Sequence, residues 1–239
     1  VTNINTGSNI IIDTTAPTIT SITSSTPNGS YKAGAIILVN INFSELITLT
    51  GTMGINLDSG GVAVVNAFTG TTAIGTYTVL AGQNSLDLNA TSITVNNTAQ
   101  DIALNNLVLT LPITNITTGS NIIIDTIAPF LTTITSSTPN GTYGLGSNIN
   151  VSITLSEPTS LTGNISIALD SGGSATINAF ANATAASGTY TVAALQNSLD
   201  LSATVVTVLG TSSDAAGNLM VTAIPVTNIN TGSNIVIDT

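Results

Sequence analysis

The chain has 239 residues with one Lys, no Arg, His or Cys, and 11 acidic residues, so its formal net charge is −10. This balance excludes binding to nucleic acid or to anionic lipid, which both need basic patches, and the lack of cysteine excludes a disulfide framework. Apolar residues make up 42% of the chain, yet no run approaches the ~20 residues of a spanning helix. We expect no membrane insertion in this segment.

The acidic residues recur in register along the chain. Asp13 and Asp125 are 112 residues apart, as are Glu45 and Glu157. The first copy carries Asp13, Glu45, Asp58, Asp87 and Asp101, the second carries Asp125, Glu157, Asp170, Asp200 and Asp214, and Asp238 opens a third. This period exceeds the roughly 20–50 residues of a solenoid or propeller unit. It fits tandem globular domains of about 100 residues.

A 12-residue segment marks the repeat boundaries. Residues 2–13 (TNINTGSNIIID) match 114–125 and 227–238. The sequence therefore predicts that residues 1–12 form the last strand of a preceding repeat. Residues 13–124 are then a first repeat, and 125–239 a second, with the start of a further repeat at 238.

The predicted strands follow one another with turn signals between them. The first strand begins after Pro17 and ends at the Asn-Gly turn of 26–29 (TPNG). Residues 37–44 alternate between apolar and polar, as does the copy at 149–156, which is typical of a strand with one buried face. Ile55 and Leu57 precede a hairpin signal at 58–61 (DSGG). Further predicted strand segments are 62–68, 77–80, 86–95 and a closing strand at 122–124.

About seven short antiparallel strands per repeat predict an all-β fold of tandem immunoglobulin-like β-sandwich domains. Three motifs occur in order within it: DTTAP at 13–17, FSE at 43–45 and DAAGN at 214–218. Together they resemble the bacterial immunoglobulin-like (cadherin-like) tandem repeats of giant extracellular adhesins and surface proteins. The resemblance covers both repeats, although Leu104 replaces the motif's Gly in the first. It implies spacer domains at the cell surface that bind Ca2+ at or near their junctions.

Strand direction predicts where the carboxylates meet. Glu45, at the end of a returning strand, is expected near Asp13 and Asp101, while Asp58 and Asp87 are expected at the opposite end. There Asp125 would join them with Glu157 and Asp214 of the following repeat. Clustered oxygen ligands favour Ca2+ over Mg2+, and the lack of His and Cys disfavours zinc. The candidate metal ligands are Asp13, Glu45, Asp58, Asp87, Asp101, Asp125, Glu157, Asp170, Asp200, Asp214 and Asp238.

Simpler roles are open for several of these residues. Asp58 and its copy fit a turn, because Asp beside Gly and Ser accepts backbone N–H bonds. Asp87 and Asp200, each flanked by Leu, fit the solvent face of a strand. Lys32 fits a solvated loop charge. In this interpretation the acids form turns and keep the chain soluble.

The composition argues against an enzyme, because the general acid and base inventory is thin and every acid is duplicated. The leading hypothesis is a structural stalk of an extracellular or cell-surface adhesin-like protein, stiffened by Ca2+ and contacting neighbouring repeats of the same protein. The alternative is a subunit of a filament, sheath or surface layer that self-associates into fibres by lateral or strand-addition contacts. A ligand-binding adhesin tip would need a non-repeated exposed loop, and the one-residue insertion within 181–187 offers little of one.

Overall fold

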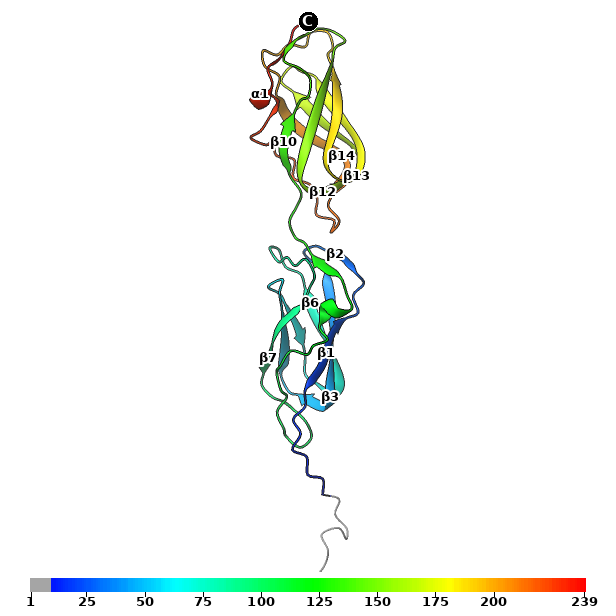
Figure 1. Ribbon diagram of the computed structural model, residues 1–239, viewed down its shortest axis with the longest axis vertical. Coiled ribbons are helices and arrows are strands. Elements are labelled where there is room, and N and C mark those ends of the chain that lie inside the picture. Colours follow the sequence, from blue (N-terminus) through cyan, green and yellow to red (C-terminus); the bar gives the residue numbers. More distant parts are fainter. Residues whose placement is uncertain (1–9) are drawn as a thin grey trace, which may run out of the picture. The chain divides into compact units, whose positions relative to one another are not determined.

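The computed structural model describes residues 10–239, and these residues form an all-β protein (Figure 1). The chain divides into two compact units, Val1–Thr126 and Ile127–Thr239. Helical structure in the described part of the chain is limited to one turn in each unit, η1 (Ile116–Thr118) and α1 (Ile229–Gly232). Residues 1–9, most of the predicted last strand of a preceding repeat, lie outside the described residues.

The first unit contains one large sheet and one short strand pair. The sheet is seven-stranded in the order β1-β3-β6-β5-β4-β7, with β8 paired to β3, and β2 pairs with β9. The strands are β1 (Ile19–Ser24), β2 (Gly29–Tyr31), β3 (Ile36–Leu49), β4 (Thr52–Leu57), β5 (Val62–Val65), β6 (Phe68–Thr78), β7 (Ala90–Asn96), β8 (Ala99–Gln100) and β9 (Ile122–Ile124).

The second unit repeats this plan with fewer and longer strands. Its four-stranded sheet has the order β10-β12-β13, with β14 paired to β12, and β11 pairs with β15. The strands are β10 (Leu131–Thr135), β11 (Gly141–Tyr143), β12 (Asn148–Leu169), β13 (Ser174–Thr191), β14 (Ala203–Ser213) and β15 (Ile235–Ile237). Strand β12 covers the residues that correspond to β3 and β4 together.

The predicted alternation creates the core of each unit. In β3, Ile37, Val39 and Ile41 are fully buried, and the residues between them are half-buried or exposed. Their copies in β12, Ile149 and Ile153 among them, are equally buried. Successive side chains of a strand point to opposite faces, so one face of each strand supplies the core.

The closing strand corrects one expectation. The predicted segment 122–124 is indeed a strand, but β9 pairs with β2 in parallel, and β15 pairs with β11 in the same way. The fold is therefore not purely antiparallel. A parallel pair needs a long crossover connection, and the chain supplies one here, because almost the whole large sheet lies in sequence between β2 and β9.

In each unit, a buried tyrosine connects the predicted hairpin to a neighbouring loop through hydrogen bonds of its hydroxyl. The β4–β5 hairpin forms at residues 58–61, as predicted, with Gly60 at φ 83°. The Tyr77 hydroxyl accepts a hydrogen bond from Ser59 Oγ at 3.0 Å and donates one to Gln83 Oε1 at 2.9 Å. A Cβ on Gly61 would collide with the Tyr77 ring, so this position requires glycine. Ser171, Gly173, Tyr190 and Gln196 repeat the arrangement in the second unit.

Candidate metal centre

Three carboxylates meet at one end of the first unit. Asp13 precedes β1, Glu45 lies within β3, and Asp101 directly follows β8. One carboxylate oxygen from each lies within 4.8 Å of the others. Asp101 is buried, and the other two are partly exposed. We call these three residues the first acidic trio, and the end of the unit that holds them its entry end.

Glu45 is positioned by an irregularity in β3. The pairing of β3 with β6 shifts register between Asn42 and Ile47, and Glu45 lies inside that interval. An extra residue in one strand of a pair bends the strand and turns a side chain away from the ladder. In the second unit, Glu157 lies inside the corresponding register shift of β12, between Thr154 and Thr159. The repeat therefore preserves the bulge together with the acid.

Asp101 is held by the short loop that it opens. Asn105 donates its backbone N–H to Asp101 Oδ1 at 2.8 Å and its side-chain Nδ2 to Asp101 Oδ2 at 2.7 Å. The same Nδ2 donates to the Asp13 backbone carbonyl at 3.2 Å, so Asn105 joins two members of the trio. Asp13 Oδ1 in turn accepts the Thr15 N–H at 2.9 Å.

The charges of the first trio affect its members differently. Partial desolvation raises the pKa of the Glu45 carboxyl, and the negative charges of Asp13 and Asp101 raise it further. Desolvation also acts to raise the pKa of Asp101, but hydrogen bonds from the Asn105 side chain and from the backbone of residues 103–105 outweigh it, so this pKa is lowered. Asp101 therefore stays charged and Glu45 bears the mutual repulsion, which a bound cation would relieve.

Asp125, Glu157 and Asp214 form the second acidic trio, with ligand atoms that also lie within 4.8 Å of one another. Asp214 accepts from Asn218 N at 2.9 Å and from Asn218 Nδ2 at 2.7 Å, as Asp101 does from Asn105. The replacement of Gly217 by Leu104 does not change the loop geometry, because both residues have a left-handed backbone, at φ 86° and 70°.

The donor set suits a hard cation. Carboxylate and carbonyl oxygens are the ligands that Ca2+ takes, usually six to eight of them. The three carboxylates of a trio offer more lone pairs than the hydrogen bonds of Asn105 and Thr15 occupy. Further oxygens would have to come from backbone or water. The residues present therefore fit Ca2+ and lack the nitrogen and sulfur ligands of a zinc site.

The remaining candidate ligands are not part of either group of three acids found among the described residues. Asp58 accepts from Ser85 Oγ and Asn89 N, both at 3.0 Å. Asp170 accepts from Ser202 alone, through the backbone N–H at 3.0 Å and Oγ at 3.1 Å. These contacts connect the hairpin turn to a loop about 30 residues further along the chain, whereas the turn interpretation expected bonds within the turn itself. Asp87 and Asp200 lie outside the strands, and each has one buried carboxylate oxygen without a hydrogen-bond partner. The backbone N–H of Asp238 bonds to Tyr143 O.

The sequence did not predict that Asn105 and Asn218 would hold Asp101 and Asp214 by hydrogen bonds. The DxxxN spacing at 101–105 and 214–218 was visible as a motif. Asn105 binds one Asp101 oxygen through its backbone N–H and the other through its side-chain amide, which also binds the Asp13 carbonyl. The last contact depends on the fold, because Asp13 and Asn105 are 92 residues apart.

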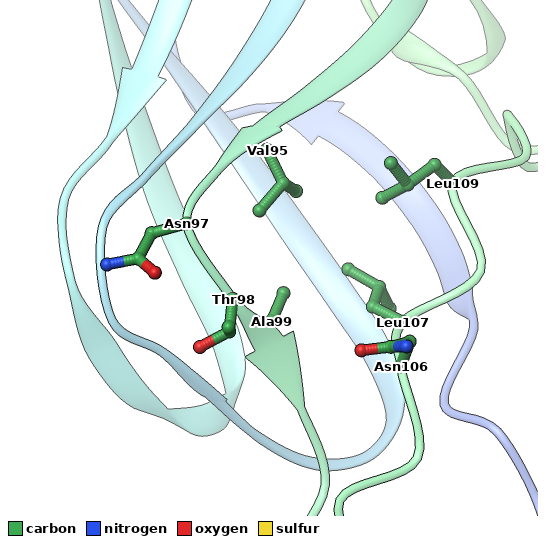
Figure 2. Close-up of a pocket in the computed structure, with 7 residues that line it drawn as sticks. All are labelled: Val95, Asn97, Thr98, Ala99, Asn106, Leu107 and Leu109. Carbon is green, nitrogen blue, oxygen red and sulfur yellow. The ribbon is translucent and has the colours of Figure 1, made fainter.

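A separate pocket of about 250 Å³ lies on the first unit, near the end of β7 (Figure 2). Its lining combines apolar side chains with amides and a hydroxyl: Val95, Asn97, Thr98, Ala99, Asn106, Leu107 and Leu109. None of these side chains titrates near neutral pH, so the pocket offers no general acid or base.

Comparison with known proteins yields no match, neither to a family model nor to a curated protein. In the described part of the chain, no helix is long and apolar enough to cross a membrane.

Proposed function

We propose that the chain consists of structural spacer repeats, with immunoglobulin-like sandwich architecture, from the stalk of a long extracellular, adhesin-like protein, and that Ca2+ stiffens them. The duplicated acidic trio is the single observation that carries this proposal. The chain has one Lys and no Arg or His, yet it keeps two groups of three carboxylates, in each of which one oxygen per residue lies within 4.8 Å of the others. Such clusters are costly unless a cation compensates them.

In this role, Asp101 and Asp214 are the preorganised ligands, because their loop asparagines already orient both carboxylate oxygens. Glu45 and Glu157 would complete the sites from the bulged strands. The bound Ca2+ supplies positive charge and a preference for many oxygen ligands. Because it binds the folded state, it stabilises that state by mass action. We infer no catalytic role.

The proposed stiffening of the segment between the units depends on Asp125. This residue comes just before the boundary between the units at Thr126 and Ile127, and its backbone N–H donates to Tyr31 O at 3.0 Å in the first unit. We propose that a Ca2+ ion shared by Asp125, Glu157 and Asp214 restricts the connecting segment. A row of such repeats would then behave as a stiff spacer.

Calorimetric titration of the chain with Ca2+ tests the proposal, combined with thermal melting before and after chelation. We expect stoichiometric binding and a raised melting temperature. The variants Asp101→Asn and Asp214→Asn should each remove one site, and Asp58→Asn, a loop-connecting acid outside the trios, serves as the control that retains both. If the chain binds no Ca2+, or if Asp58→Asn abolishes binding as fully as Asp101→Asn does, the proposed sites are wrong.

A self-assembling subunit of a filament, sheath or surface layer is a second candidate. It is supported by the sequence of Ile10, Ile11 and Ile12, which matches the closing strand β9. Strand addition to a second chain would bury them. Electron microscopy of concentrated protein distinguishes the candidates, because a filament or sheath subunit forms ordered assemblies and a stalk segment stays dispersed.

A further inference from the structure

The segment that follows β9 is held to a loop of the first unit by hydrogen bonds. Thr126 donates its backbone N–H to Asn84 Oδ1 at 2.8 Å, and its hydroxyl donates to the same oxygen at 3.3 Å. Gly82 donates its backbone N–H to Thr126 Oγ1 at 3.0 Å. We call Gly82, Asn84 and Thr126 the linker clamp.

The loop that carries Gly82 and Asn84 is itself fixed to the first unit. Ser85 and Ile124 exchange two backbone hydrogen bonds, each of 2.8 Å, and Ile124 is a buried residue at the end of β9. Asn84 Nδ2 donates to Gly82 O at 3.3 Å, which orients the side-chain amide within the loop. The acceptor oxygen of Asn84 is therefore placed by the core strand β9.

Asp125 lies between two residues whose backbones are bonded to the first unit. Ile124 precedes it in β9, Thr126 follows it in the linker clamp, and its own N–H donates to Tyr31 O at 3.0 Å. Its carboxylate belongs to the second acidic trio. A ligand whose backbone is already ordered loses less conformational entropy when it binds an ion.

The same arrangement recurs after β15 in the second unit. Thr239 donates its backbone N–H to Asn197 Oδ1 at 3.0 Å, and Gln196 donates its N–H to Thr239 Oγ1 at 3.1 Å. The preceding Asp238 N–H donates to Tyr143 O at 3.1 Å. The contact between the asparagine and the threonine is therefore a feature of the repeat, and Asn197 supplies a matched control for Asn84.

We propose that Asn84 and Thr126 are positioning residues for the second acidic trio. They fix the connecting segment to the first unit without metal, and so hold Asp125 ready to bind a cation. Neither residue carries a charge, so each acts through the backbone of Asp125. This inference rests on the proposed function, because Asp125 is a proposed ligand there. Its consequence is that the affinity of the second site for Ca2+ depends on a loop of the first unit.

Hydrogen exchange of the Thr126 backbone N–H, followed by NMR of the full chain in chelator, tests the linker clamp without metal. We expect slow exchange in the wild type and exchange about tenfold faster or more in Asn84→Ala, because the acceptor is lost. Asn84→Asp keeps an acceptor oxygen and should keep the slow exchange. Asn197→Ala should leave Thr126 unchanged. Equal exchange in Asn84→Ala and the wild type overturns the clamp.

Calorimetric Ca2+ titration tests the positioning role, in an Asp101→Asn background that retains only the second trio. Adding Asn84→Ala should weaken binding by about tenfold, because Asp125 must then be ordered as the ion binds. Adding Asn197→Ala should not change the affinity. An affinity unchanged by Asn84→Ala overturns the positioning role and leaves the proposed function intact. If the Asp101→Asn chain binds no Ca2+ while Thr126 still exchanges slowly, the proposed function fails and the clamp stands.

Discussion

The effect of each acidic trio on the stability of the folded state depends on individual side chains. Glu45 is the member whose pKa is raised, first by desolvation and then by the charges of Asp13 and Asp101. A raised pKa in the folded state means that the favourable contribution to stability is present below the ordinary pKa of about 4.3 and is lost as the pH rises through the folded value. Without a cation, Glu45 is therefore unfavourable at neutral pH.

The effect of Glu45→Gln on the melting temperature should change sign when Ca2+ is added. In chelator at pH 7 it removes repulsion, so we expect a higher melting temperature than that of the wild type. This advantage should vanish below about pH 4, where Glu45 is protonated in both states. In saturating Ca2+ the variant should melt lower, with about tenfold weaker binding at this site, because a charged ligand is lost. Thermal melting in the two buffers measures both effects, and the same shift in both would contradict the model.

Tyr77 stabilises the first unit through the hydrogen bonds of its hydroxyl. Tyr77→Phe leaves Ser59 and Gln83 without their shared partner, so we expect a loss of about 1–3 kcal/mol in the free energy of unfolding. Burial raises the pKa of Tyr77 above its usual range, partly offset by the Ser59 hydrogen bond, and the Asp58 charge adds to the rise. Wild-type stability should therefore fall as the pH rises above about 10. The Tyr77→Phe variant should lack this pH-dependent loss.

Denaturation in urea between pH 7 and pH 11 measures both effects. Tyr31→Phe is the matched control, because its hydroxyl makes only an exposed bond to Pro27 O at 2.7 Å. An equal loss in the two variants would argue against the buried network.

At the scale of elements, the closing strand is the last piece of each unit's core. Ile122 of β9 and Ile235 of β15 are fully buried, and the strands pair in parallel with β2 and β11. Ile122→Ala should lower the free energy of unfolding of the first unit by about 2–5 kcal/mol. Ile235→Ala should lower that of the second unit by the same amount. Ile11→Ala, at an exposed residue of matching sequence, should have almost no effect.

Urea unfolding with a fluorescent label in each unit in turn checks this prediction. Because the two cores contain no common residues, each substitution should shift the transition of its own unit. Equal shifts in both units after either substitution would show that the units unfold as one.

Hydrophobic periodicity predicted the buried faces of β3 and β12 because it reports burial directly, whereas the expected segments 77–80 and 86–95 differ from the strands Phe68–Thr78 and Ala90–Asn96. The alternation at 37–44 and 149–156 marks the buried faces of β3 and β12. It did not predict their lengths. The chain continues through Glu45 and Glu157 as bulged strand, and a bulge depends on the partner strand rather than on local residues. The parallel pairing of β9 was missed for the same reason, since the direction of pairing is a tertiary property.

At the scale of the whole molecule, the proposed function concerns the connection between the two units. Asp125→Asn and Asp13→Asn each weaken one trio, but only Asp125 precedes the boundary at Thr126 and Ile127. We expect Ca2+ to narrow the distribution of distances between spin labels on the two units of the wild type. Asp125→Asn should abolish this narrowing, and Asp13→Asn should preserve it. The junction model fails if both variants behave alike in saturating Ca2+.

The amino-acid sequence alone established the all-β character, the repeat of about 112 residues and the duplication of the acids, because these are properties of residue order and periodicity. Which acids meet was settled by the folded chain. Asp13, Glu45 and Asp101 come from three distant segments that the sheet pairing and one bulge bring within 4.8 Å, whereas Asp58 binds a neighbouring loop instead. Distances between segments remote in sequence depend on strand pairing and register, and local patterns do not encode these.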